Sequence, residues 1–279
     1  MKNRRRSATR HNVTRPQNSL PEDPLPKFVE PQLATLVSVV PEGTKWLHEL
    51  KLDGYRILCR LDVNQVTLLT RTAQDWTHRM PAVAEAVKKL PARQAFVDGE
   101  VVALDDSGMP SFQLLQNSFR YGDASRLVYY AFDLLYVDGR DLRGAALVER
   151  KQTLQRLLTA RTTNHGNGAV RFSEHWLGRG KKLYKKACEM GLEGIVAKRI
   201  DEPYRSGRGQ SWLKIKCLKS QEFVIGGFTE PAGARSGFGA LLIGVHDNGG
   251  ALRYVGRVGT GFNDRLLRDL RARLEKLER

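Results

Sequence analysis

Short runs in which apolar and polar residues alternate recur along the chain and predict β-strands. They lie at residues 54–61, 65–70, 94–104, 127–135 and 194–197. Between them, residues 80–90, 146–158 and 181–190 have helical patterns, and Leu147, Leu154 and Leu158 share one face of the second. Gly191 follows the third at the position where a helix commonly ends. This mixture predicts an α+β domain built on antiparallel sheets.

The C-terminal part has a different pattern. Three predicted strands with Gly-rich turns occupy residues 222–228, 239–246 and 252–258, and a helix with a leucine stripe covers 263–279. Three strands and a helix are the beginning of a small barrel of the oligonucleotide-binding (OB) type, which needs five strands, so the predicted barrel is incomplete. We therefore expect a basic flexible arm over residues 1–26, a large domain over 27–220 and a partial OB-fold domain over 221–279.

Composition narrows the class of protein. The chain has 279 residues, of which 41% are apolar, and no apolar run approaches the roughly 20 residues that a membrane span needs. The basic N-terminus does not lead into an apolar segment, which argues against a signal peptide. Cys59, Cys188 and Cys217 lie far apart, so we expect neither a zinc cluster nor a disulfide, and we interpret Cys59 and Cys217 as buried thiols. A reducing, cytoplasmic location is expected.

Charge indicates the partner. The net charge of +16 and the pI near 10.0 favour encounters with polyanions, of which nucleic acid is the obvious candidate. Basic residues are clustered in the N-terminal arm and again in the third predicted helix, at Arg179, Lys181, Lys182, Lys185 and Lys186. We expect these four lysines to contact DNA.

Four segments carry the candidate chemistry. The first, Glu49-Leu-Lys-Leu-Asp-Gly-Tyr-Arg56, pairs a potential nucleophile, Lys51, with an acid, a glycine and an arginine. The second and third, residues 96–102 and 192–198, place Glu100 and Glu193 beside short apolar runs. In the fourth, residues 212–216, a period of two sends Lys214 and Lys216 to one face of a strand, where two cations suit a phosphate.

These groups fit a lysine that attacks a nucleotide phosphate. An amine attacks phosphorus only when it is neutral, and a lysine with a pKa near 10.4 is almost wholly protonated at pH 7, so the site must favour the neutral amine. Nearby cations do so, and Lys214, Lys216 and a bound Mg²⁺ are the candidates. Glu100 and Glu193 are the candidate metal ligands, because Mg²⁺ needs only one or two protein carboxylates.

From about Pro26 to Gly261, this ordered set of motifs resembles the nucleotidyltransferase superfamily of ATP-dependent DNA ligases, and most closely the ligase domain of bacterial DNA ligase D. The resemblance implies an antiparallel-sheet (ATP-grasp-like) nucleotidyltransferase domain followed by an OB-fold domain. It also implies ATP and Mg²⁺ (or Mn²⁺) as cofactors and sealing of nicks between a 5′-phosphate and a 3′-hydroxyl, in DNA repair by end joining. Lys51 would form a covalent lysyl-AMP.

The resemblance also implies roles for other residues. Glu49 lies next to the adenine edge, and Arg56 contacts ribose or the nick phosphate. Arg71 places the phosphate or the DNA end, and Phe132 stacks on adenine. Asp98 contacts ribose, while Glu100 and Glu193 hold the metal. The remaining nucleotide-binding residues are Asp53, Gly54, Lys198, Lys214 and Lys216, with the three lysines around the α-phosphate.

One departure from the family pattern is expected to matter. A basic motif usually ends the barrel domain of these ligases and orients the outgoing pyrophosphate, and nothing equivalent follows Gly261 in these 279 residues. We expect slow self-adenylation by this chain and less impaired sealing of a nick that is already adenylated. A single-turnover adenylation rate equal to that of a full-length relative would contradict this.

Other functions stay open at this point. An RNA ligase or a GTP-dependent capping enzyme uses the same lysine chemistry, and a non-catalytic DNA-binding scaffold would explain the charge alone. For a ligase we expect a monomer acting on nicked double-stranded DNA near the bacterial nucleoid, with no membrane contact. A Ku-type end-binding partner follows only by analogy.

Overall fold

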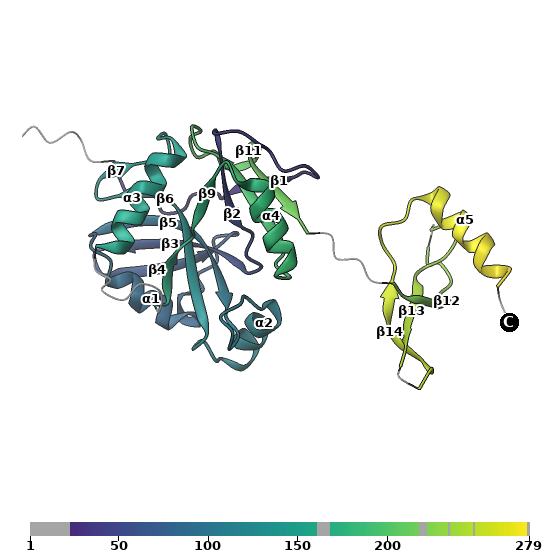
Figure 1. Cartoon of the computed structure of the whole chain (residues 1–279). Helices are drawn as coiled ribbons and strands as arrows, with labels where there is room; N and C mark the ends of the chain where they lie inside the picture. Colours follow the sequence, from purple (N-terminus) through teal and green to yellow (C-terminus); the bar gives the residue numbers. More distant parts are fainter. Residues whose placement is uncertain (1–22, 161–167, 218–221, 234, 248, 278–279) are drawn as a thin grey trace, which may run out of the picture. The chain divides into compact units, whose positions relative to one another are not determined.

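Two compact units make up the computed structural model, Met1–Cys217 and Leu218–Arg279 (Figure 1). Residues 23–160, 168–217, 222–233, 235–247 and 249–277 are described here, so most of the N-terminal arm lies outside the described residues. The last residues that we assign to the arm contact the first unit, since Asp23 donates its N–H to Gly139 O at 2.9 Å and accepts from the Tyr136 hydroxyl at 2.6 Å.

The first unit is built on two sheets. The larger has the order β4-β3-β5-β6-β7, with antiparallel neighbours and with β8 added parallel to β6. Its strands are β3 (Tyr55–Asp62), β4 (Gln65–Thr70), β5 (Gln94–Ala103), β6 (Leu127–Val137), β7 (Arg140–Asp141) and β8 (Val170–Phe172). The smaller has the order β1-β11-β10-β2-β9, in which β1 runs parallel to β11 and the other neighbours are antiparallel. Its strands are β1 (Gln32–Leu36), β2 (Trp46–Leu50), β9 (His175–Leu177), β10 (Gly194–Arg199) and β11 (Gly207–Lys216).

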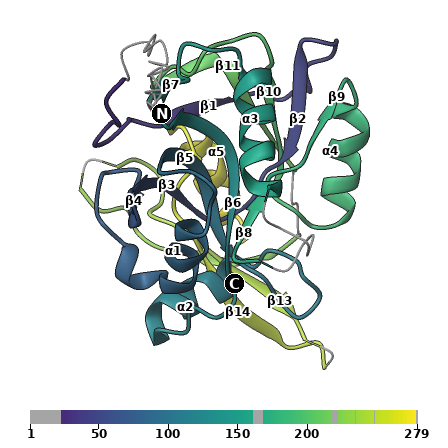
Figure 2. The same ribbon diagram turned by 90° about the vertical axis from the view of Figure 1, so that its left-hand side faces the viewer.

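Alternation along the strands buries both faces of the larger sheet. Ile57 and Cys59 of β3 pack into a core with residues of helices α1 (Pro81–Lys88), α2 (Phe112–Tyr121) and α3 (Leu147–Thr159). Figure 2 shows these helices together with the strands of the larger sheet. Leu58, which lies between the two core residues of β3, points the other way and packs with Phe132 and Trp212 between the two sheets. Helix α4 (Gly180–Glu189) covers the outer face of the smaller sheet. The antiparallel α+β architecture that the sequence predicts is confirmed, with two parallel strand pairs added.

Helix α2 and the single turn η1 (Thr77–Arg79) are absent from the sequence prediction. The chain does carry the signals that begin and end a helix at α2. Ser111 is its N-cap and accepts from the Leu114 N–H at 3.3 Å, and Gly122 follows its last turn with a φ of 76°.

Glycines of two motifs let neighbouring strands approach closely. A Cβ on Gly54 would lie 2.2 Å from Val101 O, and one on Gly99 would lie 2.4 Å from the Tyr129 ring. Both glycines therefore serve the packing of β5, which carries Glu100, against the chain around it.

The second unit contains a three-stranded antiparallel sheet of β12 (Val224–Phe228), β13 (Leu241–His246) and β14 (Leu252–Val258), followed by α5 (Asp264–Glu275). Phe238, Leu241 and Leu267 form its buried core. The Asn263 side chain caps α5 by accepting from the Leu266 N–H at 2.9 Å. The predicted three strands and helix are confirmed, and the described residues of this unit contain no fourth strand.

The cysteine prediction is wrong for two of the three residues. Cys188 at the end of α4 and Cys217 after β11 form a disulfide, with their Cα atoms 5.4 Å apart. Sequence spacing could not show this pair, because it forms through the packing of α4 on the sheet. We expected a reducing compartment because we expected no disulfide, so this disulfide removes the basis for that expectation. Cys59 is a buried free thiol, as expected, and burial raises its pKa to about 12.

Removal of this disulfide by the Cys188→Ala/Cys217→Ala pair is expected to lower the free energy of unfolding of the first unit by about 2–4 kcal/mol. The cross-link spans 29 residues and restricts the unfolded chain. Urea denaturation with and without dithiothreitol measures the effect, and the double variant should not respond to the reductant. Overlapping wild-type curves, together with three free thiols in the unreduced, denatured protein, would contradict the pairing.

None of the helices described is both long and apolar enough to cross a membrane.

Candidate active site

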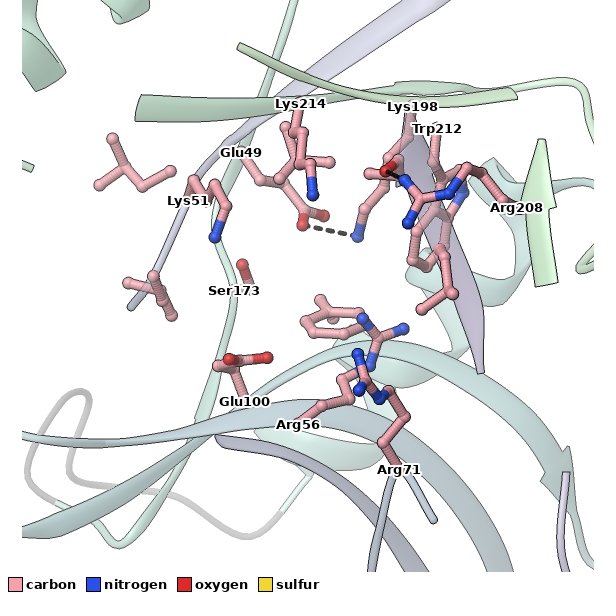
Figure 3. Close-up of a pocket in the computed structure, with 16 residues that line it drawn as sticks. Glu49, Lys51, Arg56, Arg71, Glu100, Ser173, Lys198, Arg208, Trp212 and Lys214 are labelled. Carbon is pink, nitrogen blue, oxygen red and sulfur yellow. Dashed lines mark hydrogen bonds and ion pairs between the residues drawn. The ribbon is translucent and has the colours of Figure 1, made fainter. Parts of the chain in front are cut away.

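A cavity of about 250 Å³ lies between the two sheets of the first unit (Figure 3). The smaller sheet and the residues next to it supply Glu49, Lys51, Lys198, Arg208, Trp212 and Lys214. The larger sheet supplies Arg56, Arg71, Glu100 and Phe132, and Ser173 lies between β8 and β9. All four sequence motifs therefore reach this cavity through at least one lining residue, and the third does so through Val196 and Lys198 and not through Glu193.

Lys51 follows β2 and is fixed by its own backbone, because its N–H donates to Gly194 O at 2.9 Å. Its Nζ lies 2.5 Å from Oε2 of Glu193, whose Oε1 lies 2.9 Å from Nζ of Lys216. Burial opposes ionisation of Glu193, but hydrogen bonds and attraction from these two lysines lower its pKa. Lys51 is thus an ion-paired ammonium, and attack on phosphorus requires that this pair be broken.

Glu100 faces Lys51 across the cavity, as Figure 3 shows. Within the described part of the chain, its carboxylate has no hydrogen-bond or ion-pair partner. Burial raises its pKa to about 7, against the attraction of Arg56 and Lys51. A half-buried carboxylate of this kind is stabilised by a cation, so Glu100, with Glu193 nearby, fits Mg²⁺. No group of three or more acidic, histidine or cysteine side chains able to hold a metal occurs among the described residues.

Replacement of Glu100 by glutamine is expected to stabilise the metal-free protein at pH 8 by about 1–3 kcal/mol and to have little effect at pH 5. The ordinary pKa of the side chain, 4.5, is raised to about 7 in the folded state, so the charged carboxylate costs stability as pH rises through this interval and above it. Urea denaturation in EDTA at the two pH values measures this, with Glu85→Gln in an exposed position of α1 as the control. An equal effect of Glu100→Gln at both pH values would contradict the assignment.

Glu49 is buried, and each of its two carboxylate oxygens accepts from one lysine. Lys151 of α3 donates to its Oε1, and Lys198 donates to its Oε2 at 2.7 Å. Burial opposes the charge on Glu49, but the two lysines together lower its pKa. Burial lowers the pKa of Lys198 to about 8, against the attraction of Glu49. Lys198 therefore binds Glu49 in this structure, whereas the resemblance implies a place near the α-phosphate.

The expected contact between Asp98 and ribose is not supported. Asp98 is wholly buried, and its carboxylate accepts from Arg56 at 2.5 and 2.7 Å and from the Tyr204 hydroxyl at 2.6 Å. Its side chain holds Arg56 in place instead. Arg56 also donates to Gln32 O at 3.1 Å, which leaves its guanidinium at the cavity beside Arg71.

Phe132 and Trp212 form the aromatic part of the cavity, with ring centroids 5.9 Å apart. Lys198 Nζ lies 4.1 Å from the Phe132 centroid and 4.2 Å from that of Trp212, while Arg56 Cζ lies 4.5 Å from Phe132. Cation–π attraction favours both placements. The stacking of Phe132 on adenine stays a prediction.

The strand that ends in Trp-Leu-Lys-Ile-Lys has the predicted alternation. Leu213 and Ile215 pack under α4, and Lys214 lines the cavity. Burial, Lys51 and other nearby cations lower the pKa of Lys214. Lys216 does not line the cavity, because Glu193 binds it.

Several expected site residues lie outside the cavity. Asp53 is exposed, and Gly54 packs against β5. The α4 lysines, Lys181, Lys182, Lys185 and Lys186, are all exposed on the first unit, with Lys181 ion-paired to Glu42 at 2.6 Å. Their contact with DNA stays a prediction.

The sequence interpretation missed Lys151, Ser173, Arg208 and Trp212 as site residues. For Lys151, the sequence does contain a pattern that indicates a buried side chain. This residue lies four residues after Leu147 and three before Leu154, on the apolar face of α3.

Two protein-family models match this chain. The model of the ATP dependent DNA ligase domain matches residues 31–216, two thirds of the chain, and that of the ATP dependent DNA ligase C terminal region matches residues 234–279. The chain belongs to the ATP-dependent DNA ligase family. The predicted fold class, α+β with an OB-type second part, is confirmed by solved relatives of this ligase.

Similar proteins include the multifunctional non-homologous end joining protein LigD of Pseudomonas aeruginosa, which is 44% identical over 256 residues. That match covers 91% of this ligase chain and 30% of the relative. The LigD protein of Mycolicibacterium smegmatis is 37% identical, with 96% and 33% covered. This ligase chain thus spans about a third of the length of these two curated relatives.

Among solved structures, the ligase domain of M. tuberculosis LigD is 38% identical, with a TM-score of 0.59 and with 87% of this chain and 76% of that chain covered. A mycobacterial DNA ligase D complexed with ATP and MES is 36% identical, with a TM-score of 0.60 and coverage of 88% and 77%.

Proposed function

We propose that this chain seals nicks between a 5′-phosphate and a 3′-hydroxyl in double-stranded DNA, with ATP as the source of adenylate and Lys51 as the nucleophile. The observation that carries the proposal is the position of Lys51 Nζ, at a cavity that also contains an aromatic pair, several cations and a carboxylate without a hydrogen-bond or ion-pair partner among the described residues. An amine, an anion-binding surface and an apolar base site are what transfer of a nucleotide requires.

In the first step, Lys51 releases Glu193, loses a proton and attacks the α-phosphorus of ATP. A phosphorus–nitrogen bond forms, and the bond to the departing pyrophosphate breaks. The proton passes to solvent, and Glu193, whose Oε2 lies 2.5 Å from the amine in this structure, is freed as a carboxylate. In the second step, an oxygen of the DNA 5′-phosphate attacks the same phosphorus, which returns the amine to Lys51. In the third, the 3′-hydroxyl attacks the 5′-phosphate and AMP leaves.

Charge around the phosphates comes from the cavity walls. Lys214 on β11 and Arg56 and Arg71 on the opposite side offer donors to a triphosphate lying between the sheets. Glu100 and Glu193 would hold Mg²⁺ (or Mn²⁺), and the bound metal would neutralise negative charge on the phosphates. The arrangement stabilises the negative charge that shifts onto the departing pyrophosphate in the transition state.

We place DNA on the basic surface of the first unit that includes α4. Its four lysines are exposed, and a helix that repeats lysines at these positions suits phosphate contacts without base readout. The end-joining relatives support a role in double-strand break repair. A monomer that acts with a Ku-type end-binding protein near the nucleoid is part of the same proposal.

Incubation of the chain with α-labelled ATP or GTP, followed by nicked DNA or nicked RNA, tests the proposal. Label is expected on the protein from ATP, and ligated product from the DNA nick. Label from GTP alone would favour a capping enzyme, and sealing of RNA only would favour an RNA ligase. A protein that binds DNA but takes up no label would be a scaffold.

A further inference from the structure

Lys151 is a buried lysine that lies next to the cavity but does not line it. Its side chain is 1% exposed, and its Nζ donates to three acceptors, which are the Glu49 carboxylate, Phe132 O at 3.3 Å and Ser173 O at 3.1 Å. The acceptors belong to β2, β6 and the segment between β8 and β9, and all three residues line the cavity. One ammonium group therefore joins three parts of the cavity wall.

The charge balance at this point constrains Glu49. A buried ammonium is costly unless a carboxylate compensates it, and Glu49 is the carboxylate that Lys151 contacts. Glu49 also binds Lys198, so two cations hold one carboxylate by its two different oxygens. This keeps Glu49 ionised and fixes the plane of its carboxylate.

An ionised carboxylate offers only hydrogen-bond acceptors. Each oxygen has two lone-pair sites, and the two lysines use one on each oxygen, which leaves acceptor sites for a ligand. A purine with an exocyclic amine donates to such a group, whereas a purine with a carbonyl at that position presents a second acceptor and is repelled.

We propose that Lys151 is a positioning residue that makes the nucleotide pocket selective for an amino-purine over an oxo-purine, by fixing Glu49 as an ionised acceptor. Lys198 also binds Glu49, but it lines the cavity over Phe132 and Trp212 and meets the nucleotide directly. Lys151 does not line the cavity and acts through Glu49. The inference rests on the proposed use of this cavity for ATP.

Equilibrium binding of ATP and of GTP, measured by calorimetry in EDTA, tests it. Lys151→Met is expected to weaken ATP binding about 10- to 100-fold, the range for a lost charged hydrogen bond, and to change GTP binding less than about threefold. Glu49→Gln, whose amide both donates and accepts, should reduce the ATP/GTP preference similarly. Because Lys151 acts through Glu49, adding Lys151→Met to Glu49→Gln should reduce the preference no further.

The Asp133→Leu/Arg150→Met pair is the matched control. It removes a neighbouring buried ion pair between β6 and the same helix, α3, without touching Glu49, and should keep the preference for ATP. Loss of preference in this control as large as in Lys151→Met would overturn the proposal, as would an additive double variant or a Lys151→Met protein that still prefers ATP. If Lys151→Met alone does not fold, the comparison of Glu49→Gln with the charge-balanced double variant decides.

This readout is separate from the chemistry. A wild-type protein that prefers ATP but forms no covalent adduct would disprove the proposed function and leave the role of Lys151 intact. A wild-type protein that binds GTP as tightly as ATP would overturn the inference even if the adduct forms.

Discussion

Lys51→Arg is expected to lower the rate of adenylate transfer to the protein by at least about 10⁴-fold, as loss of the nucleophile does in other covalent enzymes. The guanidinium keeps the positive charge and can still pair with Glu193, so the cavity keeps its electrostatic balance. It cannot lose a proton near neutral pH, however, and is no nucleophile. The measurement is single-turnover incorporation of label from ATP.

Binding separates this effect from a damaged pocket. Lys51→Arg should bind ATP in EDTA within a few-fold of the wild type, because the amine is needed for chemistry and only weakly for the ground state. Lys45→Arg, at a side chain that is 70% exposed, should label normally. Labelling of Lys51→Arg at more than about 1% of the wild-type rate would show that another group accepts the adenylate.

Asp133→Leu is expected to lower the free energy of unfolding of the first unit by about 3–5 kcal/mol. Asp133 and Arg150 are both wholly buried and form a two-point ion pair, with both nitrogen–oxygen distances at 2.8 Å. Removal of the carboxylate leaves an uncompensated guanidinium in the interior, with Ala145 O and Glu202 O as its remaining acceptors.

Adding Arg150→Met to Asp133→Leu is expected to restore most of the lost free energy of unfolding. In Asp133→Leu/Arg150→Met no charge remains unpaired, and apolar side chains replace the buried pair. Urea denaturation of both variants measures the difference, and Glu85→Gln, which breaks an exposed pair with Lys88, should change stability by less than about 1 kcal/mol. Equal losses in the single and double variants would show that packing, and not charge, controls stability at this position.

The sequence predicts the charged side chains that line the cavity better than the buried side chains that hold them in place. Glu100 and Lys214 lie on strands, where a period of two fixes the face of each side chain, and Lys51 and Arg71 each directly follow a strand. The structure brings these four side chains to one cavity. Neither motif nor period could show that Glu193 binds both Lys51 and Lys216, since this depends on β10 beginning between the ends of β2 and β11.

The residues that the sequence missed owe their roles to tertiary packing. In α3, the run Glu149-Arg150-Lys151 has the composition of a solvated helix face, although Arg150 and Lys151 lie on the face that contains Leu147 and Leu154. Charged residues on the apolar side of an amphipathic helix are a signal for buried partners, here Asp133 and Glu49. The disulfide had no such signal.

The position of the adenylate on the protein tests the account most directly. The chain is incubated with ATP and Mg²⁺, digested, and analysed by mass spectrometry for the peptide that carries AMP. We predict a single adduct, on Lys51. An adduct on Lys198, Lys214 or any other residue, with Lys51 unmodified, would contradict it.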